Sequence, residues 1–229
     1  MLSEREYLTA GTSEKIICPG WETVRLIGRG SFGAVYEIQR DVFGHKEKAA
    51  LKVLSIPPYD DFIEALYDEA YDDADISNYL NNYLTDFLEV YSHNADMKDH
   101  PNVVSYDNIH YFRHDDGFGW NIYIKMELLT PITKVLDNEA SDEQVLRLGK
   151  DICRALIFGR SRNIAHGDIT LQNIFISNAG NHKLGDFGIK KVVKNTLPAR
   201  CQTLIITRHR KCITTSATDP WRISTLSAW

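Results

Sequence analysis

The chain has 229 residues and a formal net charge of −5, and it lacks a basic stripe that could neutralise a phosphate backbone, so nucleic acid is excluded as the main partner. Hydrophobic residues make up 43% of the chain, enough for a sizeable core, but no apolar run reaches the length of a membrane segment. The four cysteines have neither metal-ligand spacing nor the density of a small secreted domain, which favours a reducing, cytoplasmic location.

The first structured part of the chain is predicted to be a pair of strands around a glycine-rich turn. Residues 1–20 read as a flexible lead-in, and apolar alternation begins at Trp21. The glycines of the turn are Gly28, Gly30 and Gly33. Glycine lets a backbone approach phosphate oxygens closely. A dinucleotide-binding fold would need a helix after these glycines, but residues 34–38 read as a strand.

A lysine stands inside the next predicted strand. Residues 49–54 are apolar apart from Lys52, and a turn at residues 43–45 precedes them. A buried ammonium is costly unless it has a partner, so we expect Lys52 to face an anionic group. The alternative is a surface lysine whose stem lies along apolar side chains.

The middle of the chain reads as scaffold. Residues 61–93 place apolar side chains at helical spacing, and residues 103–112 and 120–129 read as strands around a turn. The apolar face of the helix is Ile76, Leu80, Tyr83, Leu84, Phe87, Leu88 and Tyr91. A capping box at residues 141–144 predicts a second helix. Its apolar face is Val145, Leu148, Ile152, Ala155 and Leu156. Both faces are expected to pack into the core.

Residues 166–188 combine acids and an amide with two short apolar runs. Asp168 stands five residues before Asn173, and Asp186 follows a polar turn at residues 177–182. This pattern predicts a β-hairpin with polar groups at its mouth. One carboxylate can accept a proton there, while the amide oxygen and the second carboxylate can hold a hard cation such as Mg²⁺.

The spacing His-x-Asp-x-x-x-x-Asn followed by Asp-Phe-Gly resembles the catalytic loop and metal-binding triplet of protein kinases. The glycine-rich turn and the strand lysine stand in the same order as in that family, and the resemblance covers residues 21–188. It implies an α+β, protein-kinase-like bilobal fold with a five-stranded antiparallel small lobe and an incomplete helical large lobe. The implied division is a lead-in at 1–20, a small lobe at 21–129, the start of a large lobe at 130–194 and a tail at 195–229.

The resemblance also implies a reaction, the transfer of the γ-phosphoryl group of ATP to Ser/Thr hydroxyls of a protein substrate. In that scheme Asp168 orients or deprotonates the hydroxyl, and Lys52 holds the phosphates. Glu89 is the expected partner of Lys52, and Glu69 is the second candidate. The metal ligands for Mg²⁺ are Asn173 and Asp186.

The nucleotide site is implied by the same resemblance. Met126 takes the gatekeeper position, and the backbone of Glu127 and Leu129 would contact the adenine. The residues expected around the nucleotide are Ile27, Gly28, Gly30, Ser31, Phe32, Gly33, Val35, Ala50, Lys52, Met126, Glu127, Leu129 and Phe175.

Two positions depart from the commonest kinase pattern. Gly167 replaces an arginine that usually clamps a phosphorylated activation loop, and Thr170 replaces a lysine that neutralises charge on the transferring group. We therefore expect weak or absent turnover. Two alternatives remain: a pseudokinase that binds nucleotide as a scaffold, and a small-molecule phosphotransferase, a group that also uses His-Gly-Asp. Tyrosine specificity is disfavoured because Leu171 and Gln172 do not match the usual Arg and Ala residues of tyrosine kinases.

Residues 195–229 are rich in Thr, Ser and Arg and contain no Ala-Pro-Glu element. Codons permitted by residues 208–212, read one base earlier, can spell Ala-Pro-Glu-Val, and those for residues 222–228 can spell Asp-Ile-Tyr-Ser-Leu-Gly. We therefore hypothesise a frameshift between about Ile189 and Thr203. A large lobe that ended at Trp229 would lack its substrate-docking half, which would impair the enzyme.

Overall fold

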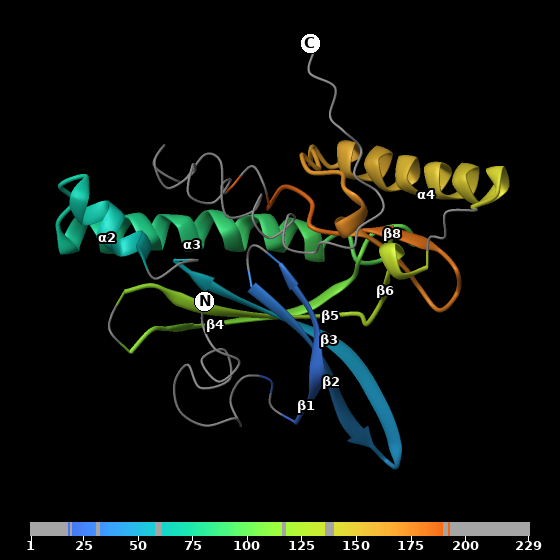
Figure 1. The fold of residues 1–229 in the computed structure, drawn as a ribbon, viewed down its shortest axis with the longest axis horizontal. Helices are drawn as coiled ribbons and strands as arrows, with labels where there is room; N and C mark the ends of the chain where they lie inside the picture. The colour runs from blue at the N-terminus through green and yellow to red at the C-terminus, as the bar shows by residue number, and fades with distance from the viewer. Residues whose placement is uncertain are drawn as a thin grey trace, which may run out of the picture.

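The computed structural model describes Cys18 and residues 20–30, 33–57, 61–115, 118–135, 140–189 and 192. Its largest element is a five-stranded antiparallel sheet in the order β1-β2-β3-β5-β4 (Figure 1). The strands are β1 Glu22–Gly30, β2 Gly33–Val42, β3 His45–Ile56, β4 Tyr106–Arg113 and β5 Trp120–Met126. Every predicted strand of the small lobe is therefore present, and the central position of β3 places Lys52 in the interior of the sheet.

A tight turn and a close backbone contact shape the three strands β1, β2 and β3. Phe43 and Gly44 form the β2–β3 turn with φ of 53° and 82°, the left-handed pair that a two-residue hairpin requires, which confirms the predicted turn. Gly33, at the start of β2, has φ of +143°, and a Cβ there would lie 1.9 Å from the main-chain oxygen of Val53. Only glycine fits, so the start of β2 can close directly over β3.

The predicted helix over residues 61–93 is two helices, α2 Asp61–Asp68 and α3 Asp73–Ala95. The break comes from local chemistry. Ala70 has a left-handed φ of 65°, and Asp72 caps α3 by accepting a hydrogen bond from the main-chain N–H of Asp75. The Asp75 carboxylate in turn accepts from the Asp72 N–H, completing a capping box. The sequence interpretation missed this box.

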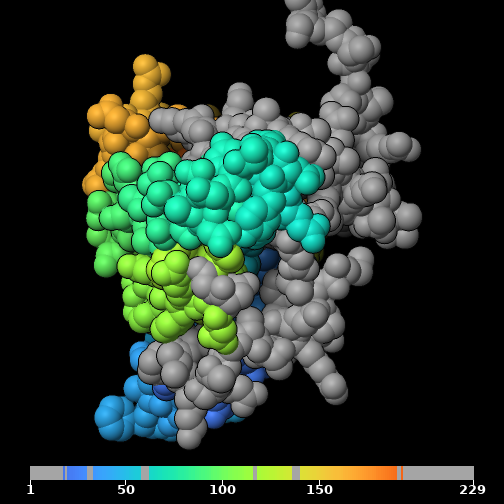
Figure 2. Space-filling model, turned by 90° about the vertical axis from the view of Figure 1, so that its left-hand side faces the viewer, coloured from blue at the N-terminus to red at the C-terminus, as the bar shows by residue number. Residues whose placement is uncertain are grey.

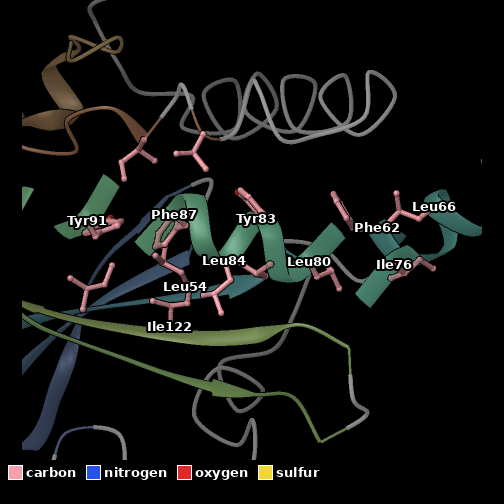
Figure 3. Packing of buried hydrophobic residues seen from close by; sticks show 14 of the residues in the cluster. Leu54, Phe62, Leu66, Ile76, Leu80, Tyr83, Leu84, Phe87, Tyr91 and Ile122 are labelled. Carbon is pink, nitrogen blue, oxygen red and sulfur yellow. The ribbon is translucent and has the colours of Figure 1, made fainter. Parts of the chain in front are cut away.

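Helix α3 lies across one face of the sheet, and its apolar side forms the main core with β3 and β5 (Figures 1 and 3). Figure 3 shows Leu84 and Phe87 of α3 directed at Leu54 and Ile122 of the sheet. The buried residues of α3 are Ile76, Leu80, Tyr83, Leu84, Phe87, Tyr91 and Asn94. The predicted face is thus confirmed, except that Leu88 is only partly buried and Asn94 is added. Each fully buried large side chain contributes about 1.5–3 kcal/mol.

A second, smaller core joins α4, Asp142–Ser161, to a three-stranded sheet of β6 Thr130–Pro131, β7 Ile174–Ile176 and β8 His182–Leu184. The β7–β8 pair is the hairpin predicted for residues 166–188. Two short 3-10 turns complete this part of the chain: η1, Ile132–Lys134, comes before α4, and η2, Leu171–Asn173, comes before β7.

Helix α4 begins with the predicted capping box between Ser141 and Gln144. Its inner face is narrower than expected: Ile152 and Ala155 are buried, but Val145 is exposed.

Figure 2 shows the surface of α2 and α3 lying directly against that of β4. Among the helices described, none is both long and apolar enough to cross a membrane.

Candidate functional site

Lys52 of β3 reaches across to the segment that follows β8. Its Nζ lies 2.8 Å from Oδ1 and 2.7 Å from Oδ2 of Asp186, so a single ammonium contacts both carboxylate oxygens. The Lys52 side chain is 13% exposed and that of Asp186 27% exposed. The expectation that Lys52 faces an anionic group is therefore confirmed, and the alternative of a surface lysine is wrong.

The two charges of this pair stabilise each other. Burial alone would raise the pKa of Asp186, but the Lys52 charge and its hydrogen bonds outweigh burial and hold that pKa below its usual range. Burial alone would lower the pKa of Lys52, but the Asp186 carboxylate outweighs it and raises that pKa. Both groups are therefore charged at neutral pH.

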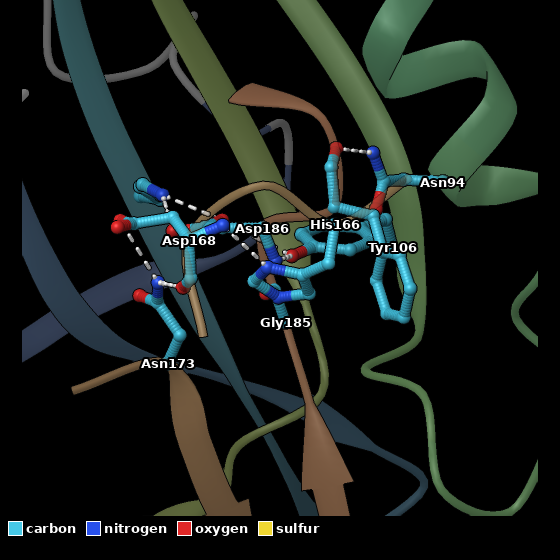
Figure 4. Close-up of polar contacts among 9 residues, drawn as sticks. Asn94, Tyr106, His166, Asp168, Asn173, Gly185 and Asp186 are labelled. Carbon is cyan, nitrogen blue, oxygen red and sulfur yellow. Dashed lines mark hydrogen bonds and ion pairs between the residues drawn. The ribbon is translucent and has the colours of Figure 1, made fainter. Parts of the chain in front are cut away.

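Asp168 and Asn173 lie together at the start of the β7–β8 hairpin (Figure 4). The Asn173 side-chain nitrogen donates to the main-chain oxygen of Asp168 at 2.8 Å and lies 3.4 Å from its Oδ2. This bond fixes the amide, so the Asn173 side-chain oxygen points away from Asp168. The structure thus brings together the acid and the amide that the motif predicted.

His166 joins this loop to the Asp186 segment. Its Nε2 donates to the main-chain oxygen of Gly185 at 2.8 Å, and its Nδ1 accepts from the main-chain N–H of Asp168 at 3.1 Å. These partners define a neutral ring with the proton on Nε2. Burial lowers the pKa of His166, in agreement with that form. The position of Asp168 is therefore linked to that of Asp186 through a single imidazole.

Two tyrosines that the sequence interpretation missed surround Asp186. The Tyr106 hydroxyl of β4 accepts from the Asp186 main-chain N–H at 2.9 Å and lies 3.2 Å from its Oδ1. Tyr91 of α3 packs edge-on against the Tyr106 ring at 5.4 Å. Burial raises the pKa of both hydroxyls well above the usual value, and the nearby Asp186 charge adds to this. A tyrosine in an apolar strand signals that its hydroxyl needs a partner, but not which one.

The structure does not bring Glu89 to Lys52, which corrects the sequence prediction. Glu89 is exposed on α3, because the buried face of that helix runs through Phe87 and Tyr91. The second candidate, Glu69, is exposed in the turn between α2 and α3. In this structure the partner of the Lys52 ammonium is Asp186.

Strand register places several of the predicted nucleotide residues on one face of the sheet. Val35 pairs with Lys52, and Ala50 pairs with Met126. Because cross-strand partners and alternate residues of a strand share a face, these four side chains lie on the same side. Among the other predicted contacts, Ile27 and Phe175 are partly buried, and Gly28 is exposed.

The remaining predicted contacts lie at the glycine-rich turn and after β5. Gly30 ends β1 and Gly33 begins β2, while Ser31 and Phe32 lie outside the described residues. The main-chain N–H of Glu127 donates to the Ser105 oxygen at 3.1 Å, so at Glu127 the carbonyl is the group left for an adenine. Leu129 is partly buried beyond it.

The donor set suits a small hard cation. Asn173 offers an amide oxygen, and Asp186 offers a carboxylate that stays ionised below the usual pKa range. Oxygen donors of this kind are those that Mg²⁺ prefers, with further positions left for water and phosphate. Within the described residues no group of three or more His, Cys, Asp or Glu side chains could hold a metal by itself. The amide oxygen of Asn173 and the carboxylate of Asp186 are donors that would fit such a cation, with its other positions taken by water or phosphate oxygens. The hypothesised frameshift falls almost wholly outside the described residues.

Comparisons with known proteins agree with this geometry. The family model described as "Protein kinase domain" matches residues 21–209. "Probable serine/threonine-protein kinase PknB" of Lactococcus lactis is 26% identical over 201 residues, which cover 85% of this chain and 27% of that protein. "Serine/threonine-protein kinase Nek1" of Mus musculus is 35% identical over 111 residues, which cover 45% of this chain and 8% of that protein.

Among solved structures, the kinase domain of PknI from Mycobacterium tuberculosis superposes with a TM-score of 0.51 at 22% identity, covering 74% of this chain and 60% of that one. This likeness confirms the predicted α+β, kinase-like fold. The chain spans only 27% of PknB and 8% of Nek1. Because the family model covers most of the chain, the chain belongs to the protein kinase domain family.

Proposed function

We propose that this chain binds ATP with Mg²⁺ and transfers the γ-phosphoryl group to Ser/Thr hydroxyls of proteins. The observation that carries the proposal is the direct contact between Lys52 of β3, in the five-stranded sheet, and Asp186, in the segment that follows β8 of the three-stranded sheet. A buried lysine paired with a carboxylate that can also bind a cation is the arrangement that holds a polyphosphate between positive charges. The family match supports the same chemistry.

We propose a role for each of these residues. Asp168 would accept the proton of the substrate hydroxyl, since its carboxylate lies beside the Asn173 amide at the open end of the hairpin. The Lys52 ammonium would bind phosphate oxygens while it keeps its ion pair with Asp186. Asn173 and Asp186 would hold Mg²⁺, which when bound neutralises phosphate charge. His166 would hold the main chain of Asp168 beside that of Gly185, the residue before Asp186, through its two ring nitrogens.

We propose slow turnover, because the residue two positions after Asp168 is Thr170, which brings no positive charge to the transferring group. Gly167 likewise offers no side chain to bind a phosphorylated loop. The second candidate function is therefore a nucleotide-binding scaffold, favoured by these two residues. A small-molecule phosphotransferase is the third.

We also propose the lobe boundaries given by the sequence, a small lobe at 21–129 and the start of a large lobe at 130–194. The separate cores support them, since one packs α3 on the five-stranded sheet and the other packs α4 on β7 and β8. We propose a cytoplasmic location, where ATP and protein substrates are available.

The test has a binding arm and a transfer arm. Thermal shift with ATP, with and without Mg²⁺, should show stabilisation that needs both ligands. Labelled ATP should then give slow transfer to a protein rich in Ser and Thr, and less to tyrosine-only peptides or to small hydroxylated acceptors. Binding without transfer would select the scaffold, and labelled small acceptors would select the third candidate.

Matched variants make the test specific. Lys52→Met should abolish the Mg²⁺–ATP shift, whereas Lys150→Met, which removes an exposed lysine of α4, should not. Asp168→Asn should keep the shift and lose transfer, whereas Asp99→Asn, at an exposed acid, should keep both. A wild-type chain that no combination of ATP and Mg²⁺ stabilises would refute the proposed function.

A further inference from the structure

The Tyr106 hydroxyl makes two hydrogen bonds to one residue. It accepts from the Asp186 main-chain N–H at 2.9 Å and donates to Asp186 Oδ1 at 3.2 Å. Tyr106 is 2% exposed, so the hydroxyl is anchored by a ring that β4 and α3 enclose. Figure 4 shows this ring standing beside Asp186. One buried oxygen thus restrains both the backbone and the side chain of Asp186.

Asp186 needs such restraint because its backbone is in an uncommon state. Its φ is +59°, in the left-handed region that residues other than glycine adopt uncommonly. That conformation determines where the carboxylate points. Here it points at the Lys52 ammonium, 2.7 Å away. A hydrogen bond from the Asp186 N–H to Tyr106 exists only while this peptide is turned in that direction, so the hydroxyl favours the conformation that presents the carboxylate.

Tyr91 shows that burial beside Asp186 does not by itself produce these bonds. It is fully buried and packs edge-on against Tyr106, with ring centroids 5.4 Å apart. Its hydroxyl nevertheless has no hydrogen-bond partner among the described residues. The Asp186 charge raises the pKa of both tyrosines, but only the Tyr106 hydroxyl has the distance and angle of a hydrogen bond to Asp186.

We propose that Tyr106 is a positioning residue for the phosphoryl-transfer site: its hydroxyl holds Asp186 in the left-handed conformation that presents the carboxylate to Lys52 and to the cation. This inference rests on the proposed function, because it assigns Asp186 a cation to bind. Tyr106 acts through Asp186 and does not itself contact nucleotide or substrate.

The test removes one hydroxyl at a time from the full chain, in Tyr106→Phe and Tyr91→Phe. The first readout needs no ligand: hydrogen exchange of the Asp186 amide. Exchange should become faster in Tyr106→Phe, because the amide loses its acceptor, and stay as in wild type in Tyr91→Phe. Circular dichroism confirms that both variants are folded.

The second readout separates positioning from general stability. At saturating ATP, the Mg²⁺ concentration that gives half of the thermal shift should rise about tenfold in Tyr106→Phe, the expected effect of losing a hydrogen bond to a charged group. ATP without Mg²⁺ should give no thermal shift in either variant, as in wild type, and Tyr91→Phe should need the same Mg²⁺ concentration as wild type.

The outcomes are distinct for the two proposals. If wild type shows Mg²⁺-dependent ATP binding and Tyr106→Phe needs no more Mg²⁺ than Tyr91→Phe, the role of Tyr106 is refuted while the proposed function stands. Equal amide exchange in the two variants refutes the role as well. If wild type shows no Mg²⁺-dependent binding, the proposed function fails, and the positioning role fails with it.

Discussion

The side-chain amide of Asn94 donates to the main-chain oxygen of Phe187 at 2.8 Å and so joins the end of α3 to the segment that carries Asp186. The same nitrogen donates to the Val90 oxygen at 2.8 Å. Asn94 is fully buried, so neither bond competes with bulk water. The orientation of α3 and the position of Asp186 are therefore coupled through one polar side chain (Figure 4).

Replacing Asn94 should destabilise the protein strongly. Asn94→Ala leaves the Phe187 oxygen buried without its donor, which costs about 1–3 kcal/mol of unfolding free energy. Urea denaturation of both proteins measures the difference. Asn82→Ala, at an exposed position of the same helix, is the control and should change stability by less than about 0.5 kcal/mol. Equal effects of the two substitutions would contradict a structural role for the bond.

A second prediction concerns the ion pair between Glu127 and Lys183. Glu127 Oε1 lies 2.6 Å from Lys183 Nζ and accepts from the Ser105 N–H at 2.7 Å, with side chains only 27% and 12% exposed. A double-mutant cycle of Glu127→Gln and Lys183→Met should therefore give a coupling energy of about 1 kcal/mol. The exposed pair of Arg40 and Glu47 should give less than about 0.5 kcal/mol. A coupling no larger than that of the exposed pair would show that burial adds nothing.

The third prediction is a pH dependence at Asp151. This buried carboxylate of α4 accepts from Nδ1 of His182 at 2.8 Å and from its main-chain N–H at 3.2 Å. Burial would raise the pKa of Asp151, but the His182 bonds and nearby positive charge outweigh it and lower that pKa. A lowered folded-state pKa means that the stabilisation is present above the unfolded value of about 4 and is lost as pH falls through the folded value.

Urea denaturation of wild type and Asp151→Asn between pH 7 and about pH 3 measures this effect. The variant should be less stable at pH 7, and the gap should narrow as pH falls below about 4. Asp99→Asn, at an exposed acid, serves as the control. A gap that stays constant over the whole range would mean that ionisation of Asp151 does not contribute.

The fourth prediction compares two glycines of α4. A Cβ on Gly159 would lie 2.7 Å from Cε1 of Phe187 and 3.1 Å from the Ile164 oxygen, whereas a Cβ on Gly149 would meet nothing within 4 Å. Gly149→Ala should therefore stabilise by about 1 kcal/mol through helix propensity. Gly159→Ala should destabilise by about 1–3 kcal/mol, because the added methyl displaces the Phe187 ring. Thermal unfolding of both variants measures these changes in stability. Equal stabilisation by the two substitutions would contradict the close packing of Gly159 against Phe187.

Residue type and spacing predicted the order of the elements and the local groups of the site. The turn at Phe43-Gly44, the capping box at Ser141 and the β7–β8 hairpin depend on neighbouring residues, and all are present. The contact between Asp168 and Asn173 likewise lies within one short loop, at a sequence separation of five. Short-range chemistry of this kind can be recognised from residue type and spacing.

The side chains around Lys52 depend on contacts between residues far apart in the sequence. Lys52 and Asp186 are 134 residues apart in sequence, and Tyr106 and Asp186 are 80 apart. The choice of Glu89 failed because the rotation of α3 about its axis depends on packing of its whole apolar face against the sheet, which turns Tyr91 inward and Glu89 outward. The spacing of apolar residues predicts that a helix has a buried face. Which polar residues lie near Lys52 and Asp186 depends on how that face packs in the folded core.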